Sequence, residues 1–304
     1  MKIEFSEEQG KYVYGEEIPE DWNKYYAESL LVYWNCFYEI FARAFEKCEF
    51  SSLLTIFGVK GLEDAGWNAY KSSLQIINTI TLHNGTLKDG LTQRNLSLWI
   101  YGHVMEASEP YENIMNFLDI IIGEQYSIMK FPLKRNGSSP SPGEKIQKIV
   151  NKAESLGIES LRDIYGRLWD RNLRNAIFHS DYILYGNEVR IRSPFTIYSH
   201  EDINRLVNNA LAYFQVIDNL RVMFISQYQE PKVIDVHPEF RTFENEKARV
   251  IVRKGYGAIG IKDNWTLRDL AMGKIPYRIG NFYPDEKKDL ESDPLLATLP
   301  ERES

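Results

Sequence analysis

The chain has few of the features that mark secreted, disulfide-bonded or membrane-spanning proteins. Its 304 residues include only two cysteines, Cys36 and Cys48, so counting alone excludes a disulfide framework and a four-cysteine zinc site. We expect both to be buried thiols. No stretch approaches the roughly 18 consecutive apolar residues of a membrane-spanning helix, and the N-terminus lacks the basic start and apolar run of a secretory signal. The sequence therefore predicts a soluble cytoplasmic protein without a membrane anchor.

Common catalytic signatures are missing as well. No G-x-S-x-G nucleophile elbow occurs. No two histidines have the close spacing of a metal pair on a helix; they are His83, His103, His179, His200 and His237. Gly255, Gly257 and Gly260 spell G-x-G-x-x-G, but the residues that follow indicate a strand and turn, not the helix that would receive a pyrophosphate. We therefore expect no metal and no cofactor, and we expect these glycines in a hairpin or bulge.

The residues that are present indicate a mainly helical protein. Apolar residues make up 43% of the chain, which suffices for a sizeable core. Helical periodicity is typical of residues 21–45, 64–82, 108–130, 142–157, 160–179 and 201–227, with Asp21 as the N-cap of the first segment. Two β-rich runs around Gly186-Asn187 predict a short hairpin between the last two helices.

The chain divides where this helical character ends, near Pro231. Residues 1–229 form the predicted helical region, and its part from about 143 to 229 contains the segment RNLRNAIFHSDY. Residues 230–304 form a C-terminal extension with short predicted strands and an acidic tail whose composition is typical of flexible segments. The fold class predicted from composition and periodicity is therefore mainly α, with a hairpin insertion and a small β-containing extension.

The distribution of charge is more informative than its sum. A net charge of −7 argues against a broad nucleic-acid-binding surface. Residues 130–192, however, hold 12 Lys and Arg against 7 Asp and Glu, while the rest of the chain holds 24 against 36. This basic part is either a solvated face or a region that handles phosphate.

One segment in the basic part, RNLRNAIFHSDY, carries the residues for such chemistry. Arg171, Asn175 and His179 stand four apart and stack along one side of a helix, with Arg174 on the adjoining side. Arginine offers a fork of donors to phosphate oxygens, and histidine gives or takes a proton near neutral pH. His179 could therefore act on a 2′-hydroxyl or a leaving oxygen while arginine stabilises charge on phosphorus, which would select RNA over DNA.

An exposed helix face explains the same residues without chemistry. Asp163 and Arg167, like Asp170 and Arg174, stand in the acid-before-base order that stabilises an exposed helix at i,i+4 spacing. His179 lies where the helix ends, and a cation is favoured there by the helix dipole. The residues alone leave both interpretations open.

The segment RNAIFH, Arg174 to His179, resembles the R-polar-x-x-x-H motif of HEPN-domain ribonucleases, helical proteins of toxin–antitoxin, abortive-infection and other antiviral systems. The resemblance covers about residues 160–228. It implies a HEPN-like antiparallel helical bundle, Arg174 and His179 as catalytic residues, and Asn175 as a positioning residue. It also implies RNA as substrate, a homodimer with the site at its interface, and an antitoxin or regulatory partner. Arg171 matches no family position, and a phosphate contact there follows only from its place on the helix.

One position departs from the family. Some HEPN toxins carry a tyrosine two residues after the histidine, where a partner nucleotidyltransferase modifies it. Here that position is Asp181, and Tyr182 follows one later, which turns the side chain by about 100° if the helix continues. Tyr182 is thus a candidate for modification or substrate contact, but silencing by that route is not expected.

The function predicted from the sequence is a metal-independent endoribonuclease of the HEPN type, acting in defence or growth arrest. Two alternatives stay open. One is a HEPN-like helical module without catalysis that binds a nucleotide, an RNA or a protein partner. The other is a helical interaction protein whose arginine and histidine form only a surface network.

Overall fold

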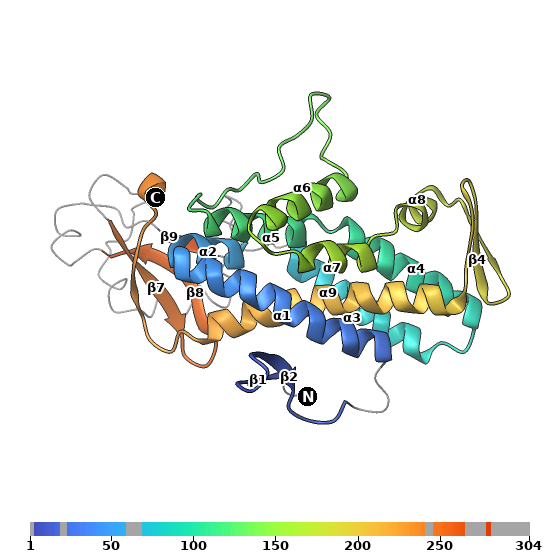
Figure 1. The fold of residues 1–304 in the computed structure, drawn as a ribbon, viewed down its shortest axis with the longest axis horizontal. Helices are drawn as coiled ribbons and strands as arrows, with labels where there is room; N and C mark the ends of the chain where they lie inside the picture. Colours follow the sequence, from blue (N-terminus) through green and yellow to red (C-terminus); the bar gives the residue numbers. More distant parts are fainter. Residues whose placement is uncertain (1–2, 19–22, 59–68, 241–245, 265–277, 281–304) are drawn as a thin grey trace, which may run out of the picture. The chain divides into compact units, whose positions relative to one another are not determined.

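The computed structural model describes residues 3–18, 23–58, 69–240, 246–264 and 278–280 (Figure 1). The predicted helix start at Asp21 and the acidic tail from Pro284 lie outside these residues. The described chain is mainly helical with small antiparallel sheets, which confirms the mainly α prediction at this level. Within the described residues, no helix is both long and apolar enough to cross a membrane.

The described residues form helices and short strands with the following bounds. The helices are α1 (Lys24–Lys47), α2 (Glu49–Phe57), α3 (Ala69–Thr86), α4 (Gly90–Glu106), α5 (Ser108–Ile121), α6 (Pro142–Ser155), α7 (Ser160–Leu168), α8 (Arg171–His179) and α9 (His200–Ser226). The strands are β1 (Ile3–Ser6), β2 (Lys11–Tyr14), β3 (Tyr182–Tyr185), β4 (Glu188–Arg192), β5 (Phe195–Tyr198), β6 (Val233–Asp235), β7 (Lys247–Arg253), β8 (Gly257–Asp263) and β9 (Arg278–Gly280).

The chain forms two compact units, each built from separate stretches of sequence. Unit 1 comprises Met1–Glu39, Ala69–Ile114 and Phe131–Leu220. Unit 2 comprises Ile40–Asn68, Met115–Lys130 and Arg221–Ser304. Helices α1, α5 and α9 contribute to both units. The predicted division between residues 229 and 230 follows the sequence and stays a prediction, although the last turn of α9 and the start of β6 bracket it.

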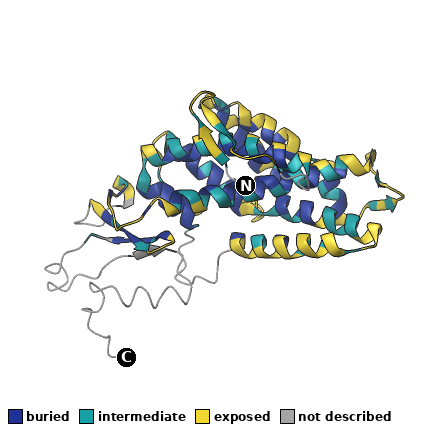
Figure 2. Cartoon of the chain, turned by 90° about the horizontal axis from the view of Figure 1, so that it is seen from below, coloured by how far each residue is buried: buried dark blue, intermediate teal, exposed yellow. Residues whose placement is uncertain are grey.

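Aromatic side chains from distant helices make the core of unit 1. Tyr213 on α9 lies at the centre, with ring centroids 5.7 Å from Phe37 of α1 and 6.0 Å from Tyr165 of α7. The hydroxyl groups of Tyr165 and Tyr213 are 3.3 Å apart, so each satisfies the other inside the core. In Figure 2 most helices carry buried residues on one side and exposed residues on the other, as amphipathic helices around a core should.

The predicted hairpin around Gly186-Asn187 is confirmed, and it is larger than expected. Strands β3 and β4 pair antiparallel across this turn, where Gly186 has φ of +54°. A third strand, β5, pairs with β4 and makes a three-stranded sheet. Strand β5 was not predicted from the sequence. Helix α8 packs against both α4 and this sheet (Figure 1).

Unit 2 contains the glycine run that mimics a nucleotide-binding fingerprint. Strand β7 turns directly into β8 through Gly255 and Gly257, whose φ values are +82° and +100°. The register shifts between Ile251 and Val252, which marks an irregularity of the bulge type. Residues after Gly257 continue as a strand instead of opening a helix. The hairpin interpretation is therefore confirmed.

Three helix predictions need correction. The segment 160–179 is two helices, because the chain breaks at Trp169 and Asp170. Helix α5 ends at Ile121 instead of near residue 130, since Gly123 follows in the left-handed region with φ of +89°. Helices α2 and α4 were not predicted; the apolar residues of α4 do not form one clear stripe. Cys36 is buried as expected, whereas Cys48 is half-buried.

Candidate functional site

Asp170 directly precedes the motif helix α8, and its carboxylate accepts hydrogen bonds from two parts of the chain. The Asp170 carboxylate accepts a hydrogen bond from the backbone N–H of Leu173 at 2.9 Å, which makes it the N-cap. The hydroxyl of Tyr198 on β5 donates to the same carboxylate at 3.0 Å. The exposed-face interpretation paired Asp170 with Arg174; the structure instead gives Asp170 the role of a cap.

A buried tyrosine joins the end of α7 to the start of α8. The hydroxyl of Tyr101 on α4 donates to the backbone carbonyl of Leu168 and accepts from the backbone N–H of Asp170, each at 2.9 Å. Burial raises the pKa of Tyr101, so the hydroxyl keeps its proton. These two bonds satisfy groups that the break between the helices would otherwise leave unpaired. Through these two bonds, Tyr101 anchors the start of α8 to α4.

The C-terminal end of α8 is also marked by a specific backbone conformation and hydrogen bond. Ser180 adopts the left-handed conformation with φ of +56°, and the backbone N–H of Asp181 donates to the carbonyl of Ala176 at 2.9 Å. This is the pattern of a helix C-terminus, so the helix ends at His179 and strand β3 begins at Tyr182. The helix end expected at His179 is confirmed, so the condition that the helix continues to Tyr182 is not met.

Arg174 is half-buried and has three partners. Its Nε and one terminal nitrogen both donate to Glu106 at the end of α4, and its other terminal nitrogen donates to the Asn175 side chain at 2.9 Å. The guanidinium carbon lies 5.1 Å from the ring centroid of Phe178. Glu106 thus orients the guanidinium and neutralises its charge in the same contact.

The remaining predicted site residues spread along α8 and into β3. Arg171 is exposed at the first position of the helix, and His179 is exposed at the last. Asn175 is half-buried and accepts the bond from Arg174. Tyr182 lies on β3, where its hydroxyl donates to Asn95 of α4 at 2.5 Å. The structure therefore brings Arg174 and Asn175 together, and it places His179 about 140° around the helix axis from Arg174.

The close packing of α4 on α8 depends on a glycine. A Cβ on Gly102 would lie 3.1 Å from Ile177 and 3.2 Å from Phe178, so a larger residue would push the helices apart. Asn95 and Glu106 lie on the same face of α4 as Gly102, four helical turns or fewer apart. The contacts of Glu106 with Arg174 and of Asn95 with Tyr182 were not predicted from the sequence, because they join residues 68 or more positions apart and α4 itself was not predicted.

A second histidine lies beside this face. His103 on α4 has a buried Nε2 with no hydrogen-bond partner among the described residues. Burial lowers the pKa of His103, which favours the neutral imidazole. It is three residues before Glu106 and hence on a neighbouring position of the helix surface.

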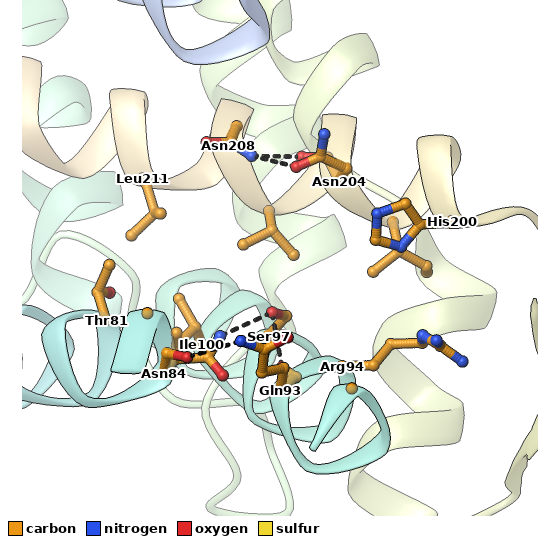
Figure 3. Close-up of a pocket in the computed structure, with 14 residues that line it drawn as sticks. Thr81, Asn84, Gln93, Arg94, Ser97, Ile100, His200, Asn204, Asn208 and Leu211 are labelled. Atoms are coloured by element: carbon orange, nitrogen blue, oxygen red, sulfur yellow. Dashed lines mark hydrogen bonds between the residues drawn. The ribbon is translucent and has the colours of Figure 1, made fainter. Parts of the chain in front are cut away.

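A separate cavity of about 390 Å³ lies in unit 1 between α3, α4 and α9 (Figure 3). In Figure 3, Arg94 and His200 lie toward one end, and the amide side chains of Asn204 and Asn208 line the wall formed by α9. The side-chain oxygen of Asn84 is buried without a hydrogen-bond partner in the described part of the chain. The cavity contains neither Arg174 nor His179, and its lining is mainly amide and apolar. It suits a small polar molecule better than acid–base chemistry.

The candidate site receives no support from a metal site among the described residues or from similarity to a known protein. The described residues contain no group of three or more His, Cys, Asp or Glu side chains that could hold a metal ion. Comparison with known proteins found no matching family model, no matching curated protein and no matching solved structure. The candidate site is therefore defined by its own geometry: Arg174 and Glu106 paired across two helices, with Asn175 alongside and His179 exposed at the helix end.

Proposed function

We propose that this protein is a metal-independent endoribonuclease of the HEPN type, with Arg174 and His179 as its catalytic residues. The observation that carries the proposal is the arrangement of α8: an oriented arginine inside the helix and an exposed histidine at its end. The proposed setting is the cytoplasm, in defence or growth arrest, with an antitoxin or regulatory partner. This setting rests on the motif resemblance.

Arg174 retains capacity for phosphate. A guanidinium has five N–H groups, and three of those on Arg174 are used by Glu106 and Asn175. Two remain for the oxygens of a scissile phosphate. Glu106 fixes the plane of the guanidinium, so that little rotamer entropy is lost when phosphate binds. Asn175 acts as the positioning residue, and exposed Arg171 would contact a neighbouring phosphate.

His179 supplies the proton transfer. Its exposed imidazole would take the proton from a 2′-hydroxyl as the 2′-oxygen attacks phosphorus, and the bond from phosphorus to the 5′-oxygen would break. The products are a 2′,3′-cyclic phosphate and a 5′-hydroxyl, whose oxygen takes its proton from the imidazolium or from water as the bond breaks. No metal or cofactor is needed for this balance.

A second copy of the chain would complete the site. Arg174 and His179 project about 140° apart on α8, so one helix does not aim both at the same phosphate. Two aromatic residues near this helix contact are exposed: Phe178 of α8, beside Gly102, is 41% exposed, and Trp99, three residues before Gly102 on α4, is 48% exposed. Pairing two α8 helices across these residues would bury the aromatic rings and oppose Arg174 of one protomer to His179 of its partner.

The test is cleavage of labelled RNA by the purified protein in EDTA. His179→Ala should reduce the rate by about 100-fold or more, since general acid–base catalysis contributes 10²–10⁴-fold. Glu106→Gln should reduce the rate less, because Arg174 keeps its charge but loses its orientation. His200→Ala is the matched control, as His200 is also an exposed histidine at a helix end and should leave the rate unchanged. A folded His179→Ala protein that cleaves at the wild-type rate would refute the proposal.

The ion pair of Arg174 with Glu106 favours one alternative, a helical module that binds RNA, a nucleotide or a protein without catalysis. A paired arginine carries less net attraction for an attacking phosphate than a free one. Equal RNA binding by wild type and His179→Ala, with no cleavage by either, would support this module. A monomer without RNA affinity would support a plain interaction protein.

A further inference from the structure

We infer that the outer face of the β3–β4–β5 sheet is a stacking platform for single-stranded RNA. Side chains alternate between the two faces of a strand, and the register places Ile183, Arg190 and Ile197 directly across from one another. The outer face also carries four other residues: Tyr185, Glu188, Arg192 and Phe195. The inner face is covered by the rest of unit 1, since Val189 and Ile191 are buried.

The four apolar side chains on this outer face are all largely exposed to solvent. Tyr185 and Ile183 are each 61% exposed, Phe195 is 78% exposed and Ile197 is 46% exposed. Scattered apolar residues on a surface are ordinary, but four on one small face indicate a surface that binds something. Two of the four are aromatic and stand on the two outer strands of the sheet.

The charges on the face select the ligand. Arg190 lies in the middle strand, with its guanidinium carbon 4.1 Å from the ring centroid of Tyr185, and Glu188 accepts two of its hydrogen bonds. Arg192 is exposed next to Phe195 in the register. Aromatic residues and arginine also occur at protein interfaces, but Arg190 on the Tyr185 ring together with exposed Arg192 suits a ligand with planar bases and negative phosphates.

The turn of the same sheet adds positive charge. Arg94 of α4 donates to the backbone carbonyl of Gly186 and to the side chain of Asn187 at 3.1 Å. Three arginines therefore lie on or at the edge of this outer face, and Glu188 is the one acidic residue among the outer-face residues of the three strands. Unpaired bases offer their faces to aromatic rings, while paired bases do not, so the platform fits single-stranded RNA and not a duplex.

The position of the sheet connects it to the proposed active site. Strand β3 begins three residues after His179, and Tyr185 follows six residues after it, at most about 20 Å along an extended chain. An RNA strand stacked on the outer face would thus lead toward the motif helix. The inference rests on the proposed function for the choice of RNA over another anionic strand, and it adds where and in what form that RNA binds.

The test is fluorescence anisotropy of a labelled, unstructured RNA, measured with the full chain in the His179→Ala background so that no cleavage occurs. The double substitution Tyr185→Ala with Phe195→Ala should weaken binding by about tenfold or more, because it removes two stacking surfaces. Tyr185→Phe should bind as well as the parent, since the ring remains. A duplex of the same sequence should bind more weakly than the single strand.

The chain offers a matched control in its other hairpin. Tyr256 is 68% exposed, and the guanidinium carbon of Arg253 lies 5.3 Å from its ring centroid. This pair repeats the chemistry of Tyr185 and Arg190, and the described strands of its sheet carry no second exposed aromatic ring. Tyr256→Ala should leave RNA binding unchanged. An equal loss from Tyr256→Ala, or no loss from the double variant, would overturn the inference.

Two further readouts separate this inference from the proposed function. Sedimentation of the double variant should give the same oligomeric state as the parent; a change from dimer to monomer would make the face a protomer interface and overturn the inference. Absence of RNA binding by the parent would also overturn it. Cleavage is measured separately with an active His179. If RNA binds through the sheet but is never cut, the platform stands and the endoribonuclease proposal fails.

Discussion

Two glycine-turn hairpins in this protein have similar local chemistry and opposite surroundings. The β3–β4 hairpin of unit 1 and the β7–β8 hairpin of unit 2 each carry a tyrosine stacked with an arginine. In the first, apolar side chains such as Ile183 face outward; in the second, residues such as Ile261 are buried. Local sequence makes both hairpins, but the surrounding elements of each unit decide how much apolar surface each hairpin exposes.

The turn glycines should give the largest contrast. A Cβ on Gly257 would lie 2.1 Å from the backbone carbonyl oxygen of Ile225, and its φ of +100° is unfavourable for alanine. Gly257→Ala should therefore lower the free energy of unfolding by about 4 kcal/mol or more. Gly186 has φ of +54° and nothing near its missing Cβ, so Gly186→Ala should cost only about 1 kcal/mol. Urea unfolding followed by circular dichroism measures both, and equal losses would contradict the comparison.

The isoleucines should give the next largest contrast. Ile261 on β8 is 2% exposed, and Ile261→Ala should cost about 3 kcal/mol through lost burial and a cavity. Ile183→Ala on β3 should change the free energy of unfolding by no more than about 0.5 kcal/mol, because that side chain already faces solvent. If Ile183→Ala were as destabilising as Ile261→Ala, its face would be buried in the native protein, for instance in a dimer.

The smallest contrast lies within one sheet, between its inner and outer tyrosines. Tyr198→Phe removes the hydroxyl that donates to the Asp170 carboxylate, and it should cost about 1–2 kcal/mol. Tyr185→Phe removes an exposed hydroxyl and should leave the unfolding midpoint unchanged. Without the Tyr198 hydroxyl the Asp170 cap would be held less firmly and the start of α8 would loosen, so Tyr198→Phe should reduce RNA cleavage slightly, whereas Tyr185→Phe should not.

Sequence patterns predicted much of the helical frame because periodicity is a local property. The helices around Tyr213, the hairpin at Gly186 and the hairpin at Gly257 all follow from spacing and turn chemistry. The break before α8 did not, since Asp170 fits both an i,i+4 ion pair and an N-cap, and only Tyr101 and Tyr198, which are distant in sequence, decide between them.

The candidate site was predictable only in part for the same reason. Arg174, Asn175 and His179 were singled out from six consecutive residues. Glu106 could not be identified, because nothing in its neighbourhood indicates that the end of α4 meets α8. The outer face of the sheet was also out of reach: alternation shows which residues share a face, but β5 was not predicted, so which face remains exposed could not be read from the sequence.

The central claim is that His179 acts on a 2′-hydroxyl of RNA, and one substrate tests it most directly. A short RNA is first mapped for its cleavage site by the wild-type protein in EDTA, and the same RNA is then made with a single 2′-deoxy nucleotide on the 5′ side of that site. The account predicts that cleavage at this bond disappears, while the unmodified RNA yields a 2′,3′-cyclic phosphate end. Cleavage of the 2′-deoxy substrate at an undiminished rate would contradict it, because the attacking oxygen would then come from elsewhere.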